Sequence, residues 1–363
     1  MARSRASARN ERPMVADEFI HLDNGLERLD EKMLQELAPR RLTITGDLQA
    51  TKQLAELRKA KGRRVYELDL PDDAIIGRPG EEADEVAVPG RTARTDAHLD
   101  AFLPANDGVV YHPKLGTARI HEPLRRRNGQ IVTPHYVFGT DDRQVFWPGG
   151  YPWRCTGRVF AWTNPSGGPA WSGAGALVGR NVVLTASHVV PWGSSPWMMQ
   201  FVPGYWDGSS VSGPSVSSYV QSYRGYRDHD QGDDMAVLKL YTPLGDSLGY
   251  FGYKTYDDDW EGGNYWTKVG YPGMVAGGQR PSRITWYPII DDDNDGAGVE
   301  LEYQADTEGG QSGAPVFAWF NGSADVVGTH SGGENNFGEP RQNVAAGGNA
   351  LTNLLHWARN NWP

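Results

Sequence analysis

Beyond about residue 137 the sequence alternates short apolar and aromatic runs with clusters of Gly, Pro, Ser and Asp. The runs recur at intervals of roughly 8–15 residues, which is typical of strands joined by tight turns. So many short strands predict an all-β fold and are consistent with two packed barrels. The expected strands are Gly157–Trp162, Gly175–Ala186, Trp197–Val202, Met235–Tyr241, Trp266–Tyr271, Ile284–Ile290, Val299–Tyr303, Pro315–Phe320 and Asp325–Thr329.

The end of the chain has a different period. Apolar residues between Ala350 and Asn361 recur at helical spacing, and Asn349 is a candidate cap at the start. The sequence therefore predicts a C-terminal helix over residues 349–362.

Composition changes near residue 136. Residues 137–363 hold 13 Lys+Arg and 23 Asp+Glu, whereas the first 136 residues hold 22 of each. The formal charge of −10 therefore arises in the later part, and all 13 tryptophans lie at or beyond Trp147. We divide the chain into an N-terminal region, residues 1–135, and a β-rich domain, residues 136–363.

The N-terminal region predicts a small α+β segment. Residues 15–38 and 48–61 have helical spacing and residues 65–70 read as a strand, while residues 71–109 are rich in Pro, Gly, Asp and Glu and read as linker. Three interpretations stay open: a prosegment that folds against the domain and is cut away, a separate regulatory or partner-binding module, and a disordered extension. Arg125–Arg127 is a candidate processing site.

The sequence Glu-Gly-Gly-Gln-Ser-Gly-Ala at residues 308–314 places Ser312 in a glycine-rich turn. Glycines let a backbone bend sharply and let a substrate approach closely, which is how a nucleophilic serine is presented. The backbone N–H groups of Gly310 and Ser312 can then point at one spot, where an oxyanion would form.

A histidine and an aspartate have matching surroundings. His188 follows a strand-like run, and Asp234 directly precedes the strand-like run at 235–240. A nucleophile, a base and an orienting carboxylate drawn from such distant segments can meet only in a folded domain. We prefer Asp234 because a buried, orienting carboxylate belongs next to an apolar strand. Three neighbouring carboxylates compete for this role and are expected to form a solvated acidic loop: Asp228, Asp230 and Asp233.

The order His188, Asp234, Ser312 resembles that of the chymotrypsin-like (trypsin-fold) serine peptidases. A closer resemblance, to the bacterial glutamyl endopeptidases of the V8-like branch, covers about residues 136–363. The segments that carry it are Asp306–Pro315, Val327–Gly333, Gly270–Gly273 and Gly139–Arg143.

This resemblance implies two packed six-stranded antiparallel β-barrels, the first over about residues 136–242 and the second over about 243–348, with a helix after them. The first barrel would carry His188 and Asp234, and the second Ser312. It implies a serine endopeptidase that needs no cofactor and no catalytic metal, with an oxyanion hole formed by Gly310 and Ser312. Unlike the animal digestive enzymes, this chain has Gln311 before the serine, so their salt-bridge activation switch is absent.

The same resemblance implies that Thr307 and His330 bind the side chain of a substrate Glu. A hydroxyl and an imidazole can hold a carboxylate through charge-assisted hydrogen bonds. Asp306 is the rival, because trypsin-like enzymes place there the aspartate that binds Lys or Arg. His330 could alternatively be a structural strand residue.

An acidic stretch, Asp291–Gly296 with Glu302 after it, satisfies the spacing of an EF-hand loop. The flanking runs read as strands rather than helices. We therefore expect an acidic hairpin loop, with a calcium site as the alternative.

The acidic balance of the β-rich domain argues against a nucleic-acid partner. No apolar run of about 18 residues is present, so no membrane span is expected. Protein or peptide substrates are the expected partners, and a monomer is expected. The resemblance implies a secreted enzyme made as a zymogen, although the start has no apolar segment typical of a signal peptide. Two alternatives to a secreted zymogen stay open. One is an intracellular protease recruited by its N-terminal region, and the other is a catalytically silent barrel used for binding.

Overall fold

The computed structural model of the protein describes residues 12–19, 83–85, 98–105, 107–116, 136–163, 168–194, 196–227, 229–334 and 341–362. Most of the predicted N-terminal α+β segment lies outside the described residues, as does the candidate processing site Arg125–Arg127. Within the predicted helix at 15–38, the described part is the short 3-10 helix η1 (Ala16–Phe19). None of the described helices is long and apolar enough to cross a membrane.

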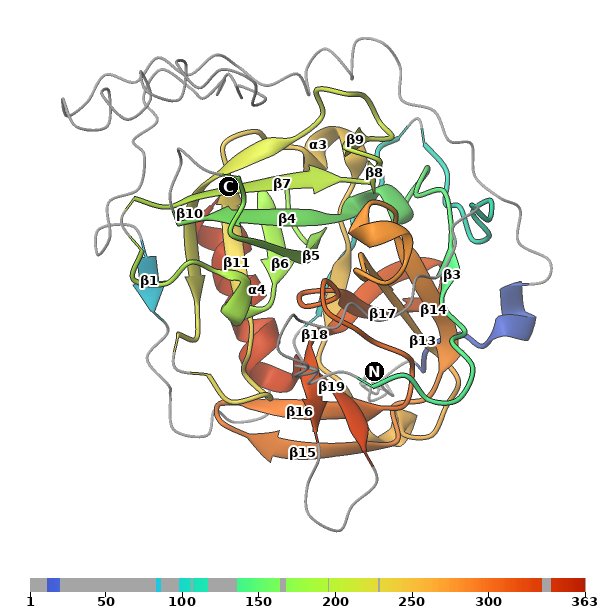
Figure 1. The fold of residues 1–363 in the computed structure, drawn as a ribbon. Coiled ribbons are helices and arrows are strands. Elements are labelled where there is room, and N and C mark those ends of the chain that lie inside the picture. The colour runs from blue at the N-terminus through green and yellow to red at the C-terminus, as the bar shows by residue number, and fades with distance from the viewer. Residues whose placement is uncertain are drawn as a thin grey trace, which may run out of the picture.

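The first half of the β-rich domain folds into a closed barrel of six strands (Figure 1). Its strands follow the order β10-β11-β6-β5-β4-β7, and pairing of β7 with β10 closes the ring. A short strand, β1 (Ala83–Glu85), pairs in parallel with β10 from outside. The barrel strands are β4 (Thr156–Trp162), β5 (Trp171–Leu177), β6 (Val182–Thr185), β7 (Met198–Pro203), β10 (Ser218–Gly225) and β11 (Ala236–Leu240).

The second half forms a ten-stranded sheet (Figure 1). The main path runs β15-β16-β19-β18-β17-β13-β14-β3, and β12 joins β18 to β2. The strands are β2 (His98–Leu99), β3 (Gln144–Val145), β12 (Gly252–Lys254), β13 (Trp266–Gly270), β14 (Ser282–Tyr287), β15 (Asp291–Asp295), β16 (Gly298–Tyr303), β17 (Pro315–Phe320), β18 (Ser323–Glu334) and β19 (Gln342–Gly347). The remaining elements are the ribbon β8 (Tyr205–Trp206) and β9 (Ser209–Ser210), and the short helices η2 (Trp153–Cys155), η3 (Ser187–Val189), α3 (Gly245–Leu248), η4 (Asp258–Trp260) and η5 (Ala276–Gly278).

The structure confirms the all-β prediction and corrects some of its details. The run Gly175–Ala186 is two strands, β5 and β6, because residues 178–181 turn the chain back on itself. The acidic stretch is a hairpin as expected, but its aspartates form strand β15 itself, with Asp291 opposite Glu302 on β16. An EF-hand loop is excluded because both flanks are strands.

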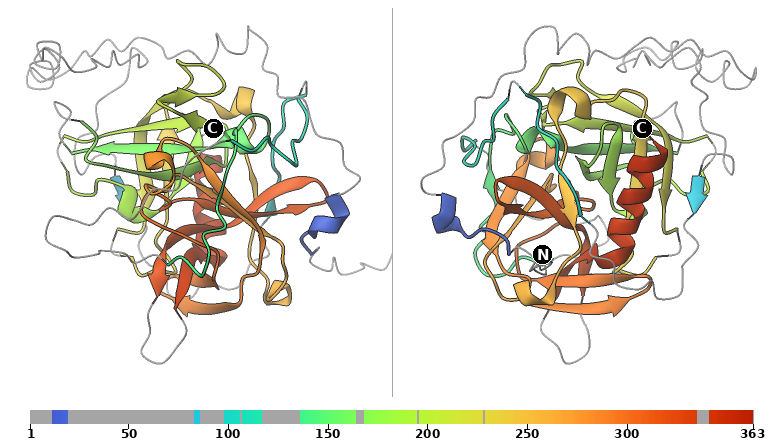
Figure 2. Two further views of the ribbon diagram at one scale, coloured as in Figure 1. Left: turned by 45° about the vertical axis from the view of Figure 1, so that its right-hand side comes forward. Right: turned by 180° about the vertical axis from the view of Figure 1, so that it is seen from behind.

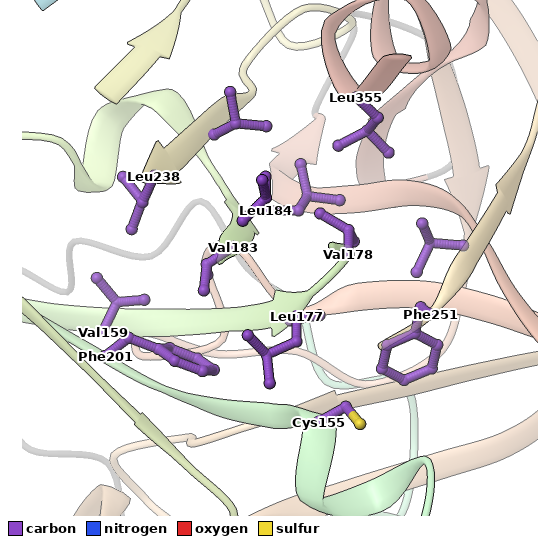
Figure 3. Packing of buried hydrophobic residues seen from close by; sticks show 14 of the residues in the cluster. Cys155, Val159, Leu177, Val178, Val183, Leu184, Phe201, Leu238, Phe251 and Leu355 are labelled. Atoms are coloured by element: carbon purple, nitrogen blue, oxygen red, sulfur yellow. The ribbon is translucent and has the colours of Figure 1, made fainter. Parts of the chain in front are cut away.

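The C-terminal helix α4 (Gly348–Asn361) confirms the predicted helix, but Gly347 rather than Asn349 occupies the capping position. Its inner face buries Leu351, Leu354, Leu355 and Ala358. Figure 3 shows Leu355 and Phe251 packed with barrel residues such as Leu177 and Val178. The helix and the second half thus share one apolar core with the barrel.

Part of the N-terminal region packs on the β-rich domain, and its residues 98–100 lie beside α4, the red helix in the view from behind (Figure 2). Strand β2 pairs with β12, and Arg359 of α4 donates to the carbonyl oxygen of Asp100. Asp107 forms a buried ion pair with Arg154, and Val110 is 3% exposed in the shared core. Phe19 is also buried, against Tyr111, Trp286 and Trp319.

Candidate active site

Strand β6 delivers His188 to the end of the barrel. All four residues of β6 are buried, and the chain then turns through η3, whose middle residue is His188. Indole N–H groups hold this turn, because Trp171 donates to the carbonyl oxygen of Val189 and Trp192 to that of Ser187. The His188 side chain is 40% exposed, so its ring is fixed on one side and open to solvent on the other.

Asp234 lies next to His188 because β11 pairs with β6. Ala236 of β11 stands opposite Thr185, so the residues just outside this pairing meet. Oδ1 of Asp234 accepts the backbone N–H of His188 at 3.0 Å, and Oδ2 lies 2.6 Å from Nδ1 of the same residue. A carboxylate bound twice by one histidine fixes both the backbone and the ring of that residue.

Ser312 is fixed against the same barrel end by its backbone. The Ala174 N–H of β5 donates to the Ser312 carbonyl oxygen at 2.7 Å. A Cβ atom on Gly173 would lie 2.7 Å from that oxygen and 2.8 Å from Cγ2 of Val189, the residue after His188. The turn carrying Ser312 therefore abuts the turn carrying His188.

The glycines around Ser312 have conformational and steric causes. Gly310 has φ +99°, and a Cβ atom there would clash with the carbonyl oxygen of Tyr271. Gly313 has φ +85°, and a Cβ atom there would clash with β5 and with the Thr185 hydroxyl. Only glycine combines this left-handed backbone with such close approach. The glycines at positions 310 and 313 are thus explained by how closely the turn packs on Tyr271 and on the barrel.

Comparisons with known proteins agree with this arrangement. Residues 173–328 match the family described as "Trypsin-like peptidase domain". The chain is 28% identical over 242 residues to a protein named "Glutamyl endopeptidase" from Bacillus licheniformis, covering 63% of this chain and 71% of that protein. It is 25% identical over 299 residues to a protein named "Extracellular metalloprotease" from Bacillus subtilis, covering 78% of this chain and 86% of that protein.

Among solved structures, "Structure of Glu endopeptidase in complex with MPD" superimposes with a TM-score of 0.50 at 21% identity, covering 62% of this chain and all of that one. This likeness concerns the fold. The class of the protein is decided by the matched peptidase domain and the glutamyl endopeptidase relative. The chain is a serine endopeptidase of the chymotrypsin fold.

Electrostatics in the endopeptidase couple His188 to Asp234. Burial disfavours protonation of His188, but the hydrogen bond and charge of Asp234 outweigh it and raise the pKa of the imidazole above 6.5. Burial likewise opposes ionisation of Asp234, but the hydrogen bond and charge of His188, with help from His229 and Ser331, lower the pKa of that carboxyl. The pair therefore favours an ionised aspartate under a basic imidazole.

Two contacts of Asp234 were not foreseen from the sequence. Ser331 Oγ donates to Oδ2 at 2.6 Å, and His229 Nε2 lies 3.6 Å from Oδ1. Ser331 comes from β18, 97 residues away in the chain, so only the fold brings it there. His229 lies in the same loop as Asp234, where the proximity of a second histidine was the available signal.

The predicted solvated acidic loop is wrong for Asp233, which is only 1% exposed. Its carboxylate accepts the backbone N–H groups of Asp230 and Ala297. It binds the turn between β15 and β16 to the loop before β11. Asp230 is exposed, as predicted, and Asp228 lies outside the described residues.

Thr307 and His330 are both buried and both contact the start of β19. Thr307 Oγ1 donates to Asn343 Oδ1 at 3.1 Å, while His330 Nδ1 lies 3.0 Å from the Val344 carbonyl oxygen and 2.7 Å from the Tyr303 hydroxyl. His330 also joins the nucleophile turn, since its carbonyl oxygen accepts the Gly313 N–H.

Asp306 faces the segment 136–145 rather than the serine turn. Its carboxylate accepts the backbone N–H groups of Phe138 and Asp142, and the side chain is buried. Nearby, Arg143 bridges Asp141 and Glu308 with its guanidinium. The segment before β3 thus fastens the residues that immediately precede the Ser312 turn.

The single cysteine, Cys155, takes no part in this site. It is fully buried beneath the barrel (Figure 3), and burial raises the pKa of its thiol to about 12. The thiol therefore stays protonated near neutral pH and cannot act as a nucleophilic thiolate.

Proposed function

We propose that the endopeptidase cleaves peptide bonds after Glu through a triad of Ser312, His188 and Asp234. The observation that carries the triad is the pair of hydrogen bonds between Asp234 and His188. Ser312 is held by its backbone at the same barrel end. Family likeness supports the Glu preference, because two of the relatives named above carry "Glu" or "Glutamyl" in their names.

In the proposed reaction, Ser312 Oγ attacks the substrate carbonyl carbon while Nε2 of His188 takes the hydroxyl proton. Asp234 keeps the other proton on Nδ1 and stabilises the imidazolium that forms. The tetrahedral oxyanion is received by the N–H groups of Gly310 and Ser312, each worth about 3–4 kcal/mol in comparable sites. His188 then gives its proton to the leaving amine, and water hydrolyses the acyl-enzyme by the same steps in reverse order.

Glu recognition is proposed for Thr307 and His330, with the single hydroxyl proton of Thr307 turning from Asn343 Oδ1 to the substrate carboxylate. Nε2 of His330 carries a proton in two of the states that these contacts allow: the neutral ring whose Nδ1 accepts from the Tyr303 hydroxyl, and the imidazolium whose Nδ1 donates to the Val344 carbonyl oxygen. In both states Nε2 can donate to a substrate carboxylate. Asp306 is disfavoured as a receptor for Lys or Arg because it already accepts two backbone N–H groups of the segment 136–145.

We also propose that residues 136–363 form the peptidase domain and that the enzyme is a secreted zymogen. Support for activation by a cut before Tyr136 comes from the contacts of this residue. Its N–H and carbonyl groups bond the side chain of Asn343, and the Thr307 N–H donates to the same carbonyl oxygen. Freeing an N-terminus near this point would change the surroundings of the specificity residues directly.

The test is to incubate the purified chain with a denatured protein and to map every cut by mass spectrometry. Cuts after Glu are expected, absent in Ser312→Ala and retained in the matched variant Ser215→Ala, whose serine is exposed. Cuts after Lys or Arg would refute the Thr307/His330 assignment, and near-normal cleavage by Ser312→Ala would refute the triad. If the full chain is silent, the same assay after cleavage at a protease site introduced just before Tyr136, which leaves the N-terminal segment packed on the domain, separates a latent enzyme from an inactive one.

A further inference from the structure

A second histidine stands beside the His188–Asp234 pair and has no role in the proposed hydrolysis. The ring centroid of His229 lies 6.2 Å from that of His188, and its Nε2 lies 3.6 Å from Oδ1 of Asp234. The three side chains offer ligand atoms that all lie within 4.8 Å of one another. Two imidazoles and a carboxylate so close together form a set of metal-binding groups.

The two imidazoles are partly open to solvent and the carboxylate is not. The side chains of His188 and His229 are 40% and 26% exposed, whereas that of Asp234 is 1% exposed. Nδ1 of His229 lies 3.3 Å from the Asp230 carbonyl oxygen, and the opposite nitrogen is turned towards Asp234. A cation arriving from solution would meet both rings first, with the carboxylate beneath them.

One ligand distance suits a small tetrahedral ion, and another must lengthen. Nδ1 of His188 lies 2.6 Å from Oδ2 of Asp234, so an ion bound to both atoms would replace the proton that they share and move them apart by roughly 0.7 Å. Zinc binds imidazole nitrogen and carboxylate oxygen at about 2.0–2.2 Å, so two ligand atoms on one ion are roughly 3.3 Å apart. The 3.6 Å between His229 Nε2 and Asp234 Oδ1 is close to this value. Two imidazoles on one such ion would have ring centroids roughly 5 Å apart, so the rings need to approach by only about 1 Å.

We propose that His188, His229 and Asp234 form an inhibitory site for a divalent transition metal, of which zinc is the representative. The inhibition rests on the proposed function, because a metal bound to His188 takes the imidazole out of proton transfer. Binding displaces a proton from any ring nitrogen that the metal occupies, and no bond of the protein or substrate is broken. A chelator should therefore restore activity in full. Magnesium should have no effect, since it prefers all-oxygen sites.

Binding is tested without reliance on activity. Zinc chloride is titrated by calorimetry into the full chain carrying Ser312→Ala, which keeps all three ligands and cannot digest itself. Saturable binding of one ion is expected. Adding His229→Gln should raise the dissociation constant for zinc by at least about tenfold, or 1.4 kcal/mol. His356→Gln removes an exposed histidine of α4 and should change nothing. Equal binding with and without His229 would overturn the site.

Inhibition is tested on the active enzyme with a Glu-containing peptide. Each variant is compared with its own zinc-free rate, and His229→Gln should need at least about tenfold more zinc for half-inhibition. Zinc that raises the rate, or inhibits both forms equally, would overturn the proposal. If the wild type cleaves no peptide yet Ser312→Ala binds zinc through His229, the proposed function fails and the metal site stands. If the enzyme is active but zinc neither binds nor inhibits it, the proposed function stands and the metal site fails.

Discussion

At the scale of single residues, Asp234 is the centre of the proposed chemistry. It bonds the backbone and ring of His188, accepts the hydroxyl of Ser331 and lies against His229. The sequence predicted His188 and Asp234 because each adjoins an apolar strand, and the two strands pair. It could not predict Ser331, since that contact depends on how the second half packs on the barrel.

The pH dependence of hydrolysis follows from His188. The base must be neutral, and its pKa is raised above 6.5, chiefly because its bond to Asp234 outweighs burial. We therefore expect kcat/KM to fall on the acid side with an apparent pKa above 6.5. The measurement uses a Glu-containing peptide whose two termini are blocked, between pH 5 and 9. Full activity persisting down to pH 5 would contradict the role of His188.

At the scale of elements, the sequence predicted strands where apolar residues dominate and missed them where they do not. Strand β11 was found because four of its five residues are apolar, whereas β10 is rich in Ser, Tyr and Gln and β19 in Ala, Gly and Asn. Both missed strands are held by neighbours on two sides, which local composition does not reveal. The segment 136–145 has little regular structure, yet it bonds Asp306, Thr307 and Glu308.

This segment gives a testable effect of pH on stability. Burial, the hydrogen bond with Asp306 and its charge raise the pKa of Asp142 from 3.8 to about 6. The folded protein therefore holds this proton more tightly than the unfolded chain, so its stabilising effect is complete below pH 3.8 and is lost as the pH rises to about 6. We expect Asp142→Asn to raise Tm at pH 7 and to leave it nearly unchanged at pH 4.

The measurement is a series of thermal melts at pH 4, 5, 6 and 7 on Ser312→Ala with and without Asp142→Asn. The gain in Tm should be modest because Asp142 is exposed in part to water. Parallel Tm profiles for the two proteins would show that the proton on Asp142 does not contribute to folding.

At the scale of the whole molecule, the two halves of the β-rich domain share one core with residues from the N-terminal region. Val110 and Phe19 belong to that core, and the ion pair of Arg154 with Asp107 is buried on both sides. The composition boundary near residue 136 therefore does not mark the limit of packing. Composition could not show this, because the residues that pack inward between 98 and 116 are few and scattered along an irregular segment.

Replacing Asp107 by Ala should therefore destabilise the whole domain. It would leave the Arg154 guanidinium, 2% exposed, without its carboxylate partner, at a cost of about 3–5 kcal/mol. Urea unfolding monitored by tryptophan fluorescence measures this loss. The control is Asp246→Ala, which removes an exposed partner of Arg180 and should cost less than about 1 kcal/mol. Equal losses in both variants would contradict an integral role for residues 98–116.

The measurement that tests the central claim most directly is covalent labelling of the serine. The chain, both intact and cut at a protease site introduced just before Tyr136, is treated with an organophosphorus fluoridate that reacts with activated serine hydroxyls, and the modified residue is identified by peptide mass mapping. One adduct on Ser312 is predicted, together with its loss in His188→Ala. An adduct on another serine, or none on Ser312 in either form of the chain, would contradict the proposed triad.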